Sequence, residues 1–331
     1  MPLNTACDNE AFQKTAELLK NADRILILTH KSPDGDTVGS AFALCRALLK
    51  LSKKARVECS DPLPVKFEYM FGGLQTEDFC PDLIVASDIA AESLFGDGLK
   101  NYEGRVGLCI DHHPSNSGYA EFTLLDPCAA ATCELMAEVI ELLNVEYDEN
   151  IADCIYTGLA TDTGCFRYSN TTAKTLRTAA AMVDRGARNS KINKALFETL
   201  SRGRIEIERM ALGAMEFYFD GRAAVMAITR EMYDSSGCGD SETEGLPAIT
   251  TRIAGVLAGV TIKEKEAGQY KISVRTNGGI NASDICARFG GGGHAAAAGC
   301  QLDGSLEDAK NAILNAVGCA LSEIKKDEQN P

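Results

Sequence analysis

Three short apolar segments of the chain each lead directly into aspartate or histidine residues. They are ILIL at 25–28 before THKSPDGD, LIVAS at 83–87 before Asp88, and VGLCI at 106–110 before Asp111, His112 and His113. Apolar runs of this length, separated by helix-like stretches, are typical of strands buried on both faces of a parallel sheet. We therefore expect an α/β domain with helices on both faces of a parallel sheet. Its carboxyl-terminal edge, where such sheets place ligands, would collect acids and imidazoles.

The first of these strand ends carries His30, Asp34 and Asp36 within one turn. Pro33 favours an extended residue before it, and Gly35 allows a sharp reversal between the two aspartates. Two carboxylates held that close repel each other unless a cation lies between them. Taken alone, the motif fits a divalent metal site and a solvated strand-to-helix turn equally well.

The other strand ends and the segment TDTGCFRYSNTT at 161–172 add further ligands. The candidate metal ligands are His30, Asp34, Asp36, Asp88, His112 and Asp162. Six such ligands exceed the needs of one tetrahedral site and suit two ions that share a carboxylate. Hard oxygen donors with imidazole and no thiolate favour Mn²⁺ or Mg²⁺, with Fe or Co²⁺ as alternatives. Asp148 and Asp153 are expected to be surface charges.

A two-ion site would balance four carboxylates, so that an anionic phosphate could approach. Such a pair can share a hydroxide nucleophile and stabilise the transition state of phosphoryl transfer. The catalytic set would then comprise Asp88, Asp111, His112 and His113. In this set His113 would bind the phosphate or protonate the leaving oxygen, and Asp111 would orient a histidine.

A glycine run at 290–293 follows Phe289 and precedes His294 and an alanine-rich, strand-like segment. Missing side chains let backbone N–H groups approach an anion or a base, and the flanking residues favour a packed loop over a linker. Arg275, at the end of a predicted hairpin formed by 259–264 and 270–276, has the forked donor geometry that binds phosphate. A surface arginine on an edge strand is the alternative reading of Arg275.

Composition narrows the classes of partner. The chain has 331 residues, 45% hydrophobic and 24% charged, with a net charge of −14. Long DNA or RNA is normally bound through a basic patch, so this balance favours small phosphorylated substrates and argues against long duplex DNA. There is no apolar run of about 20 residues and no signal-like start, which predicts a cytoplasmic protein without a membrane partner. Its 13 scattered cysteines are expected to be reduced thiols.

These motifs resemble a known family. HKSPDGDTVGS, Asp88, DHH at 111–113 and TGLATDTGCFRYSNTT resemble the four motifs of the DHH phosphoesterases, and RTNGGINASDICARFGGGGHAAAAG resembles the substrate-binding motif of their DHHA1 domain. The resemblance implies a pair of Mn²⁺ ions. One would be bound by His30, Asp34 and Asp88, and the other by Asp36, Asp88, His112 and Asp162. It also implies substrate binding by Arg167, Arg275, Gly291, Gly292, Gly293 and His294.

The resemblance further implies two lobes with the substrate cleft between them. We expect a catalytic DHH domain at 1–188, a helical connector at 189–217 and a smaller α/β DHHA1 domain at 218–331, with a homodimer compatible with the family. The nanoRNase branch of the family degrades short oligoribonucleotides, and many members remove the 3′-phosphate of adenosine 3′,5′-bisphosphate. The alternatives are a phosphodiesterase for linear or cyclic dinucleotides, a pyrophosphatase, and an inactive nucleotide sensor.

Overall fold

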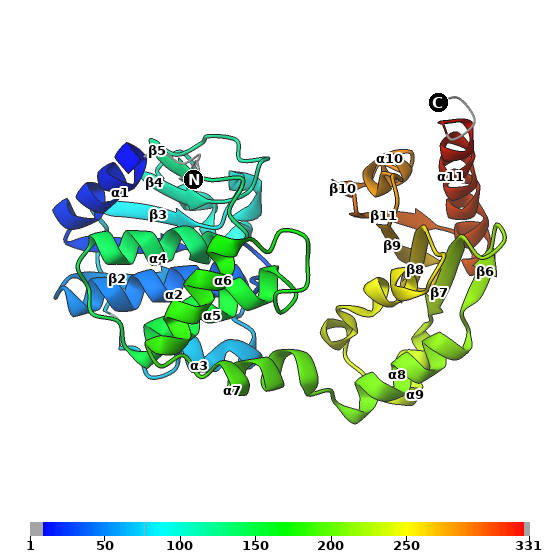
Figure 1. The fold of residues 1–331 in the computed structure, drawn as a ribbon, viewed down its shortest axis with the longest axis horizontal. Coiled ribbons are helices and arrows are strands. Elements are labelled where there is room, and N and C mark those ends of the chain that lie inside the picture. The colour runs from blue at the N-terminus through cyan, green and yellow to red at the C-terminus, as the bar shows by residue number, and fades with distance from the viewer. Residues whose placement is uncertain (1–8, 76, 328–331) are drawn as a thin grey trace. The chain divides into compact units, whose positions relative to one another are not determined.

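A computed structural model describes residues 9–75 and 77–327. The chain divides into two compact units between Thr199 and Leu200 (Figure 1). Each unit has its own sheet and its own apolar core. The two units are therefore described separately below.

The N-terminal unit is built on a five-stranded sheet in which every neighbouring pair is parallel, as the sequence predicts. Its strands are β1 (Arg24–Leu28), β2 (Lys54–Glu58), β3 (Leu83–Ser87), β4 (Leu108–Asp111) and β5 (Phe122–Leu125). The order is β2-β1-β3-β4-β5, so the direction of strand addition reverses at β1. Sheets with this order bind ligands where β1 and β3 diverge, at their carboxyl ends.

The two faces of this sheet are covered differently. Ile25, Ile27 and Val85 point into the larger core, which is shared with the five longest helices of this unit (Figure 1). Leu26 and Ile84 point into a smaller core closed by short 3₁₀-helices. The elements around the sheet are α1 (Asn9–Asn21), α2 (Gly35–Lys50), α3 (Glu68–Phe71), α4 (Thr132–Leu142), α5 (Glu149–Asp162), α6 (Ala173–Asp184), η1 (Val65–Phe67), η2 (Glu92–Leu94) and η3 (Asp97–Tyr102).

The first half of the expected helical connector is only partly α-helical. It consists of α7 (Asn189–Asn193) and one π-helical turn, η4 (Lys194–Glu198), which ends before the extended residue Thr199. The next helix, α8 (Arg202–Gly213), buries Ile207 and Ala211 in a core of the C-terminal unit. The second half of the expected connector is thus packed as part of the C-terminal unit.

The C-terminal unit has a six-stranded mixed sheet in the order β10-β11-β9-β8-β7-β6. Only β7 and β8 run parallel, while the expected hairpin is confirmed as the antiparallel pair β8 and β9. The strands are β6 (Glu216–Tyr218), β7 (Ala223–Ile228), β8 (Ala258–Glu266), β9 (Gln269–Thr276), β10 (Gly292–His294) and β11 (Ala297–Asp303). The last two residues of the glycine run, Gly292 and Gly293, lie in β10, a short strand at the edge of this sheet.

Helices cover this second sheet unequally. One core joins Val260, Ile272 and Val274 to α10 (Ala282–Ala287) and α11 (Leu306–Asp327). A smaller core on the other face joins Met226 and Ile228 of β7 to α8, α9 (Arg230–Ser236) and the 3₁₀-helix η6 (Leu246–Arg252). A further 3₁₀-helix, η5, spans Asp240–Thr243.

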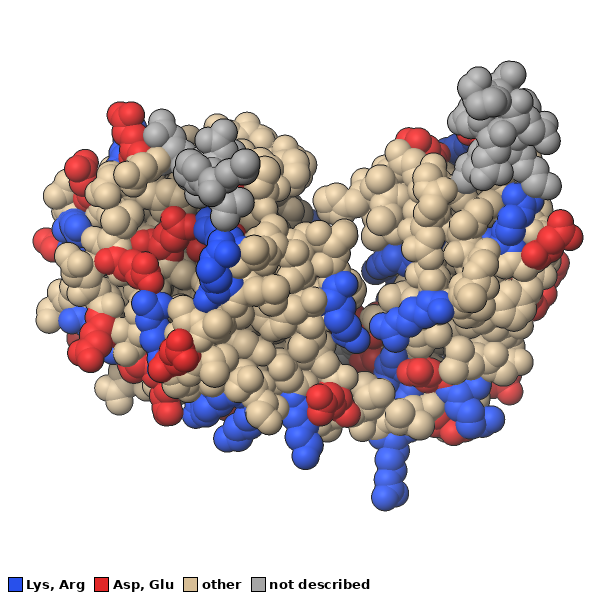
Figure 2. Space-filling model, viewed as in Figure 1, with Lys and Arg blue, Asp and Glu red and all other residues tan. Residues whose placement is uncertain are grey.

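Acidic and basic side chains are interspersed on the viewed face of both units (Figure 2). Within the described part of the chain the cysteines are unpaired, and no helix there is long and apolar enough to span a bilayer.

Candidate metal centre

The turn after β1 presents one imidazole and two carboxylates. Asp34 is the N-cap of α2, and its Oδ1 accepts hydrogen bonds from the backbone N–H groups of Asp36 and Thr37, both at 3.1 Å. The Nε2 atom of His30 lies 3.7 Å from the same Asp34 oxygen. Asp36, in the first turn of α2, is fully buried. The helix cap therefore fixes Asp34 beside His30.

Asp88 lies at the centre of the cluster. It follows β3 with a left-handed φ of 63°, and its N–H donates to the carbonyl of Ile110 at 2.9 Å. Its carboxylate is 2% exposed, and its oxygens lie 3.8 Å from His30 Nε2, 3.7 Å from His112 Nε2 and 3.5 Å from His113 Nδ1. A non-glycine residue in this conformation is uncommon, and here it turns the carboxylate toward three imidazoles.

The end of β4 supplies the other two imidazoles. Asp111 Oδ1 lies 2.7 Å from His113 Nδ1, and Asn116 Nδ2 donates to Asp111 Oδ2 at 2.6 Å. Since a carboxylate can only accept, His113 Nδ1 carries the proton, and Nε2 is the ring nitrogen that Asp111 does not engage. The structure thus places Asp111 as the partner of His113.

Both His30 and His112 turn Nδ1 toward a main-chain carbonyl. The contacts are 2.8 Å to Lys31 O and 3.2 Å to Ala129 O. Because a carbonyl only accepts, Nδ1 is protonated in both rings, which leaves the Nε2 lone pair of the neutral imidazole facing the carboxylates. His112 Nε2 is buried and has no hydrogen-bond partner among the described residues.

Asp162, at the end of α5, completes the set, with its Oδ2 3.4 Å from His112 Nε2. This helix lies close to α2 because a glycine stands at Gly158. A Cβ atom there would be only 2.5 Å from Asp36 Oδ1. The absence of a side chain at Gly158 is therefore what lets α5 pack against the buried Asp36 carboxylate.

Comparisons with known proteins identify the family of this chain. The profile of the DHH family, N-terminal domain, matches residues 24–159, and that of the DHHA1 domain matches residues 235–323. A Thermus thermophilus protein named bifunctional oligoribonuclease and PAP phosphatase NrnA is 33% identical over 93% of this chain and 94% of its own length. The chain belongs to the DHH family of phosphoesterases.

Two further relatives bear on its fold and its branch. The crystal structure of an exopolyphosphatase-related protein from Bacteroides fragilis superposes with a TM-score of 0.89, covering 98% of this chain and all of that one at 24% identity. The cyclic-di-AMP phosphodiesterase GdpP of Geobacillus thermodenitrificans is 26% identical over 91% of this chain and 48% of its own length. This DHH phosphoesterase therefore shares its two-unit fold with solved proteins.

The side chains of the phosphoesterase fit a divalent metal site. Three groups have one donor atom per residue within 4.8 Å of one another: His30–Asp34–Asp88, Asp36–His112–Asp162 and Asp88–His112–His113. Two ligands bound at about 2.1 Å to one octahedral ion lie roughly 3 Å apart, slightly closer than most contacts here. The unpartnered Nε2 atom of His112 and the presence of Asp88 in two of the three groups fit a divalent cation in this cluster.

Electrostatics point to the same need for a cation. Burial, followed by repulsion from Asp162, raises the pKa of Asp36 to about 7. Burial, followed by repulsion from Asp36 and Asp34, raises the pKa of Asp88 to about 8. Burial opposes protonation of His112, but the Asp162 oxygen 3.4 Å from its Nε2 and the other nearby carboxylates raise its pKa to about 10. Without a bound cation, protons must supply positive charge to this cluster.

The start of α4 holds two of the acids, and sequence reasoning missed it. The N–H groups of Thr132 and Cys133 donate to the two Asp36 oxygens at 2.6 and 2.9 Å, and Thr132 Oγ1 donates to Asp88 Oδ1 at 2.8 Å. All of these groups are buried. The sequence offers a weak signal, a threonine at the start of a helical apolar run, but nothing that connects it to Asp36 or Asp88.

Most of the predicted substrate-binding residues lie in the C-terminal unit. Arg275 is on β9 opposite Ala297, and the glycine run continues into the exposed His294 on β10. The N-terminal unit contributes Arg167, whose Nε donates to Gly164 O at 2.5 Å in the loop after Asp162. The expected glycine loop is only partly a loop, because the run pairs with β11 from Gly292 onward. A Cβ at Gly291 would lie 2.2 Å from Gly299 O, so close strand packing explains the glycine there.

Proposed function

We propose that this phosphoesterase hydrolyses short oligoribonucleotides to mononucleotides and removes the 3′-phosphate of adenosine 3′,5′-bisphosphate. The observation that carries the proposal is the set of two imidazole Nε2 atoms and four carboxylates gathered where β1 and β3 diverge. The Thermus thermophilus relative, matched over nearly its full length, is named for both activities.

The metal-binding residues we propose are His30, Asp34, Asp36, Asp88, His112 and Asp162, with Mn²⁺ as the preferred ion because the donors are hard oxygens and imidazoles. A bound ion would neutralise phosphate charge and lower the pKa of a water molecule. Asp88 would contribute to both ions. His112, locked through Nδ1 to Ala129 O, would present Nε2 without a change of tautomer.

His113 is the residue we propose for proton transfer. Its side chain is 33% exposed, and Asp111 holds Nδ1 at 2.7 Å. Asp111 stabilises the imidazolium and keeps Nε2 available to protonate the leaving oxygen. Arg275, His294, Arg167 and the glycine run Gly291, Gly292 and Gly293 would bind the rest of the nucleotide.

The remaining proposals concern organisation. Residues 1–188 would form the catalytic domain, 189–217 the connector and 218–331 the substrate-binding domain of a cytoplasmic enzyme. A homodimer is also proposed. Leu176 and Val183, exposed and seven residues apart on α6, offer an apolar contact, and sedimentation velocity measures the mass.

The test is a Mn²⁺-supplemented hydrolysis panel read by chromatography. It contains RNA of two to five nucleotides, a 24-mer, adenosine 3′,5′-bisphosphate, and linear and cyclic dinucleotides, with Asp88→Ala as the inactive control. Rapid loss of the shortest RNAs and of the bisphosphate, with the 24-mer slow, is the expected result. Turnover confined to dinucleotides would favour a dinucleotide phosphodiesterase, an activity named in the Geobacillus relative. Nucleotide binding with no turnover at all would instead identify a sensor.

A further inference from the structure

One face of the C-terminal sheet carries a line of polar and cationic side chains. Along β9 the residues alternate, with Ile272 and Val274 in the core under α10 and α11 and Lys271, Ser273 and Arg275 on the opposite face. On β11 the residues paired with these three are Gln301, Gly299 and Ala297. Small residues therefore separate the cation at Arg275 from the cation at Lys271.

This part of the face is left open by the helices that cover the rest of it. The 3₁₀-helix η6 packs tightly over β8, where a Cβ at Gly259 would collide with Thr250. By contrast, Lys271 and Gln301 are exposed and Ser273, Arg275 and Gly299 are half-buried. The open strip is long enough to reach from Arg275 to the far end of β9.

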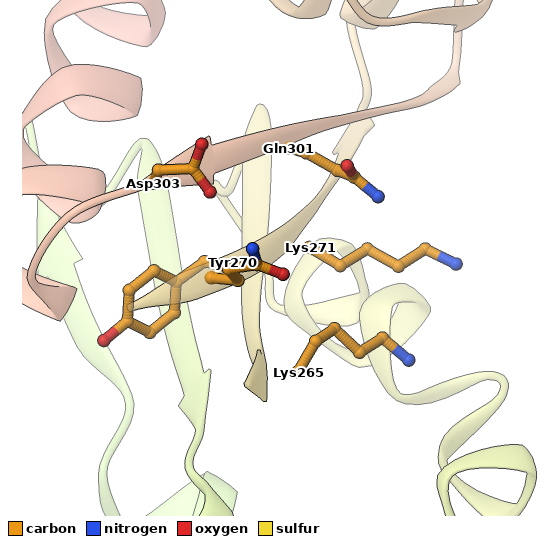
Figure 3. A pocket seen from close by; sticks show the side chains of 6 residues that line it. Lys265, Tyr270, Lys271, Gln301 and Asp303 are labelled. Carbon is orange, nitrogen blue, oxygen red and sulfur yellow. The ribbon is translucent and has the colours of Figure 1, made fainter. Parts of the chain in front are cut away.

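Three lysines meet at that far end. Lys263 of β8 is the cross-strand partner of Lys271, and Lys265 lies two residues further along β8. Figure 3 shows Lys265, Lys271 and Gln301 projecting side by side, whereas Tyr270 points the other way. Like charges on adjacent strands destabilise a sheet. The cluster thus has an unfavourable charge arrangement that an anion would relieve.

Two of the three lysines already have partners among the described residues. Lys265 pairs with Asp240, and the buried Lys263 Nζ donates to the carbonyl and hydroxyl of Thr243. Lys271 has no hydrogen bond or ion pair with any described residue, although Asp303 also lines the pocket. Lys271 is consequently the cation available to an external anion.

The size of the pocket selects the kind of anion. Its volume is about 150 Å³, whereas sites that enclose a whole small molecule measure roughly 300–1,000 Å³. A phosphate group fits a space of this size. The four-residue step from Arg275 to Lys271 spans about 13 Å of strand. At the duplex spacing of about 3.4 Å along one strand, this length holds roughly four phosphates. An extended single strand places fewer phosphates over the same length.

We propose that Lys271, with Lys265 and Gln301, binds a backbone phosphate of a single-stranded oligonucleotide. One end of this oligonucleotide is held at Arg275, and the phosphate bound by Lys271 lies further along it. This inference rests on the proposed function and adds a length-dependent subsite to it. A dinucleotide or adenosine 3′,5′-bisphosphate ends before Lys271, while a pentanucleotide reaches it. The subsite therefore favours the longer members of the substrate class.

The experiment compares the wild-type protein with Lys271→Gln, using pentanucleotide RNA, dinucleotide RNA and adenosine 3′,5′-bisphosphate. Lys20→Gln, which removes one exposed lysine from α1, is the control for net charge, and Lys271→Arg is the control that keeps the cation. For Lys271→Gln we expect the pentanucleotide KM to rise about 3- to 10-fold. The two short substrates should change less than twofold. The slope of log KM against log salt for the pentanucleotide should fall by about 0.7, the value for one lost phosphate contact on a single strand.

Two outcomes would overturn the subsite. In the first, Lys271→Gln and Lys20→Gln have the same KM for the pentanucleotide. In the second, Lys271→Gln raises the KM of the dinucleotide and of the pentanucleotide by the same factor. Either result leaves the proposed function standing, because the wild-type protein still turns over its substrates. Failure of the wild-type protein to hydrolyse any of the three would overturn the proposed function and the subsite together.

Discussion

Thr132→Val removes one hydroxyl from the candidate metal centre and keeps the shape of the side chain. In the native protein this hydroxyl donates to Asp88 at 2.8 Å in a fully buried position. The backbone N–H of residue 132, which donates to Asp36, is retained in the variant. The substitution therefore removes a hydrogen bond from Asp88, whose carboxylate belongs to two of the candidate ligand groups. It leaves the hydrogen bond to Asp36 in place.

The magnitude follows from the kind of bond. A hydrogen bond to a charged group contributes about 1.5–3 kcal/mol, and each 1.4 kcal/mol is a factor of about ten in affinity. We expect the dissociation constant for Mn²⁺ to rise about 10- to 100-fold, the range found when groups that orient metal ligands are removed. Titration calorimetry on chelator-stripped protein measures this constant directly, without any dependence on turnover.

Thr132→Ser is the matched control, because it restores a hydroxyl at the same position. It should bind Mn²⁺ within about threefold of the wild-type protein, and both variants should unfold cooperatively. The reasoning fails if Thr132→Val binds the ion as tightly as the wild-type protein does. It fails equally if Thr132→Ser is as weak as the valine variant, since the effect would then not come from the hydroxyl.

Two further predictions concern stability. Gly158→Ala places a Cβ 2.5 Å from Asp36 Oδ1. We therefore expect urea denaturation to show a loss of about 1–3 kcal/mol of unfolding free energy, together with weaker Mn²⁺ binding. An unchanged urea midpoint would contradict the tight packing of α5. Burial lowers the pKa of Lys263 to about 8, from 10.5 in the unfolded chain. Between these two pH values the unfolded state binds more protons than the folded state. The contribution of Lys263 to stability therefore rises with pH in this window, by about 1 kcal/mol per pH unit. Lys263→Met should lack that rise between pH 8 and pH 10, and a variant with the wild-type slope would refute the assignment.

Much of the N-terminal fold could be predicted because its signals are local. Buried parallel strands are continuous apolar runs, and their carboxyl ends share one edge of the sheet, so Asp88 and His112 could be placed near His30 from sequence order alone. The strand β5 was missed, since FTLL is short and half-buried. The hairpin of β8 and β9 was visible because two β-rich runs flank Ala267 and Gly268.

Individual hydrogen bonds between distant segments could not be predicted. Asp153 was expected on the surface, but it is fully buried and accepts hydrogen bonds from the backbone N–H and guanidinium of Arg188. Its partner lies 35 residues away, and sequence periodicity does not encode such pairing. The role of Thr132 was missed for the same reason. It depends on the hydrogen bond between the start of α4 and Asp88, the residue that follows β3.

The predicted ligands are spread along the chain from His30 to Asp162, yet they meet at one point. An ion bound there would act as a reversible cross-link that closes long loops between the strand ends and α5. Ligand binding to the folded state alone adds about 2.7 kcal/mol of stability when the ion is present at 100 times its dissociation constant. The C-terminal unit has no share in this link, because its core is separate. The availability of the ion would thus raise or lower the stability of the N-terminal unit alone.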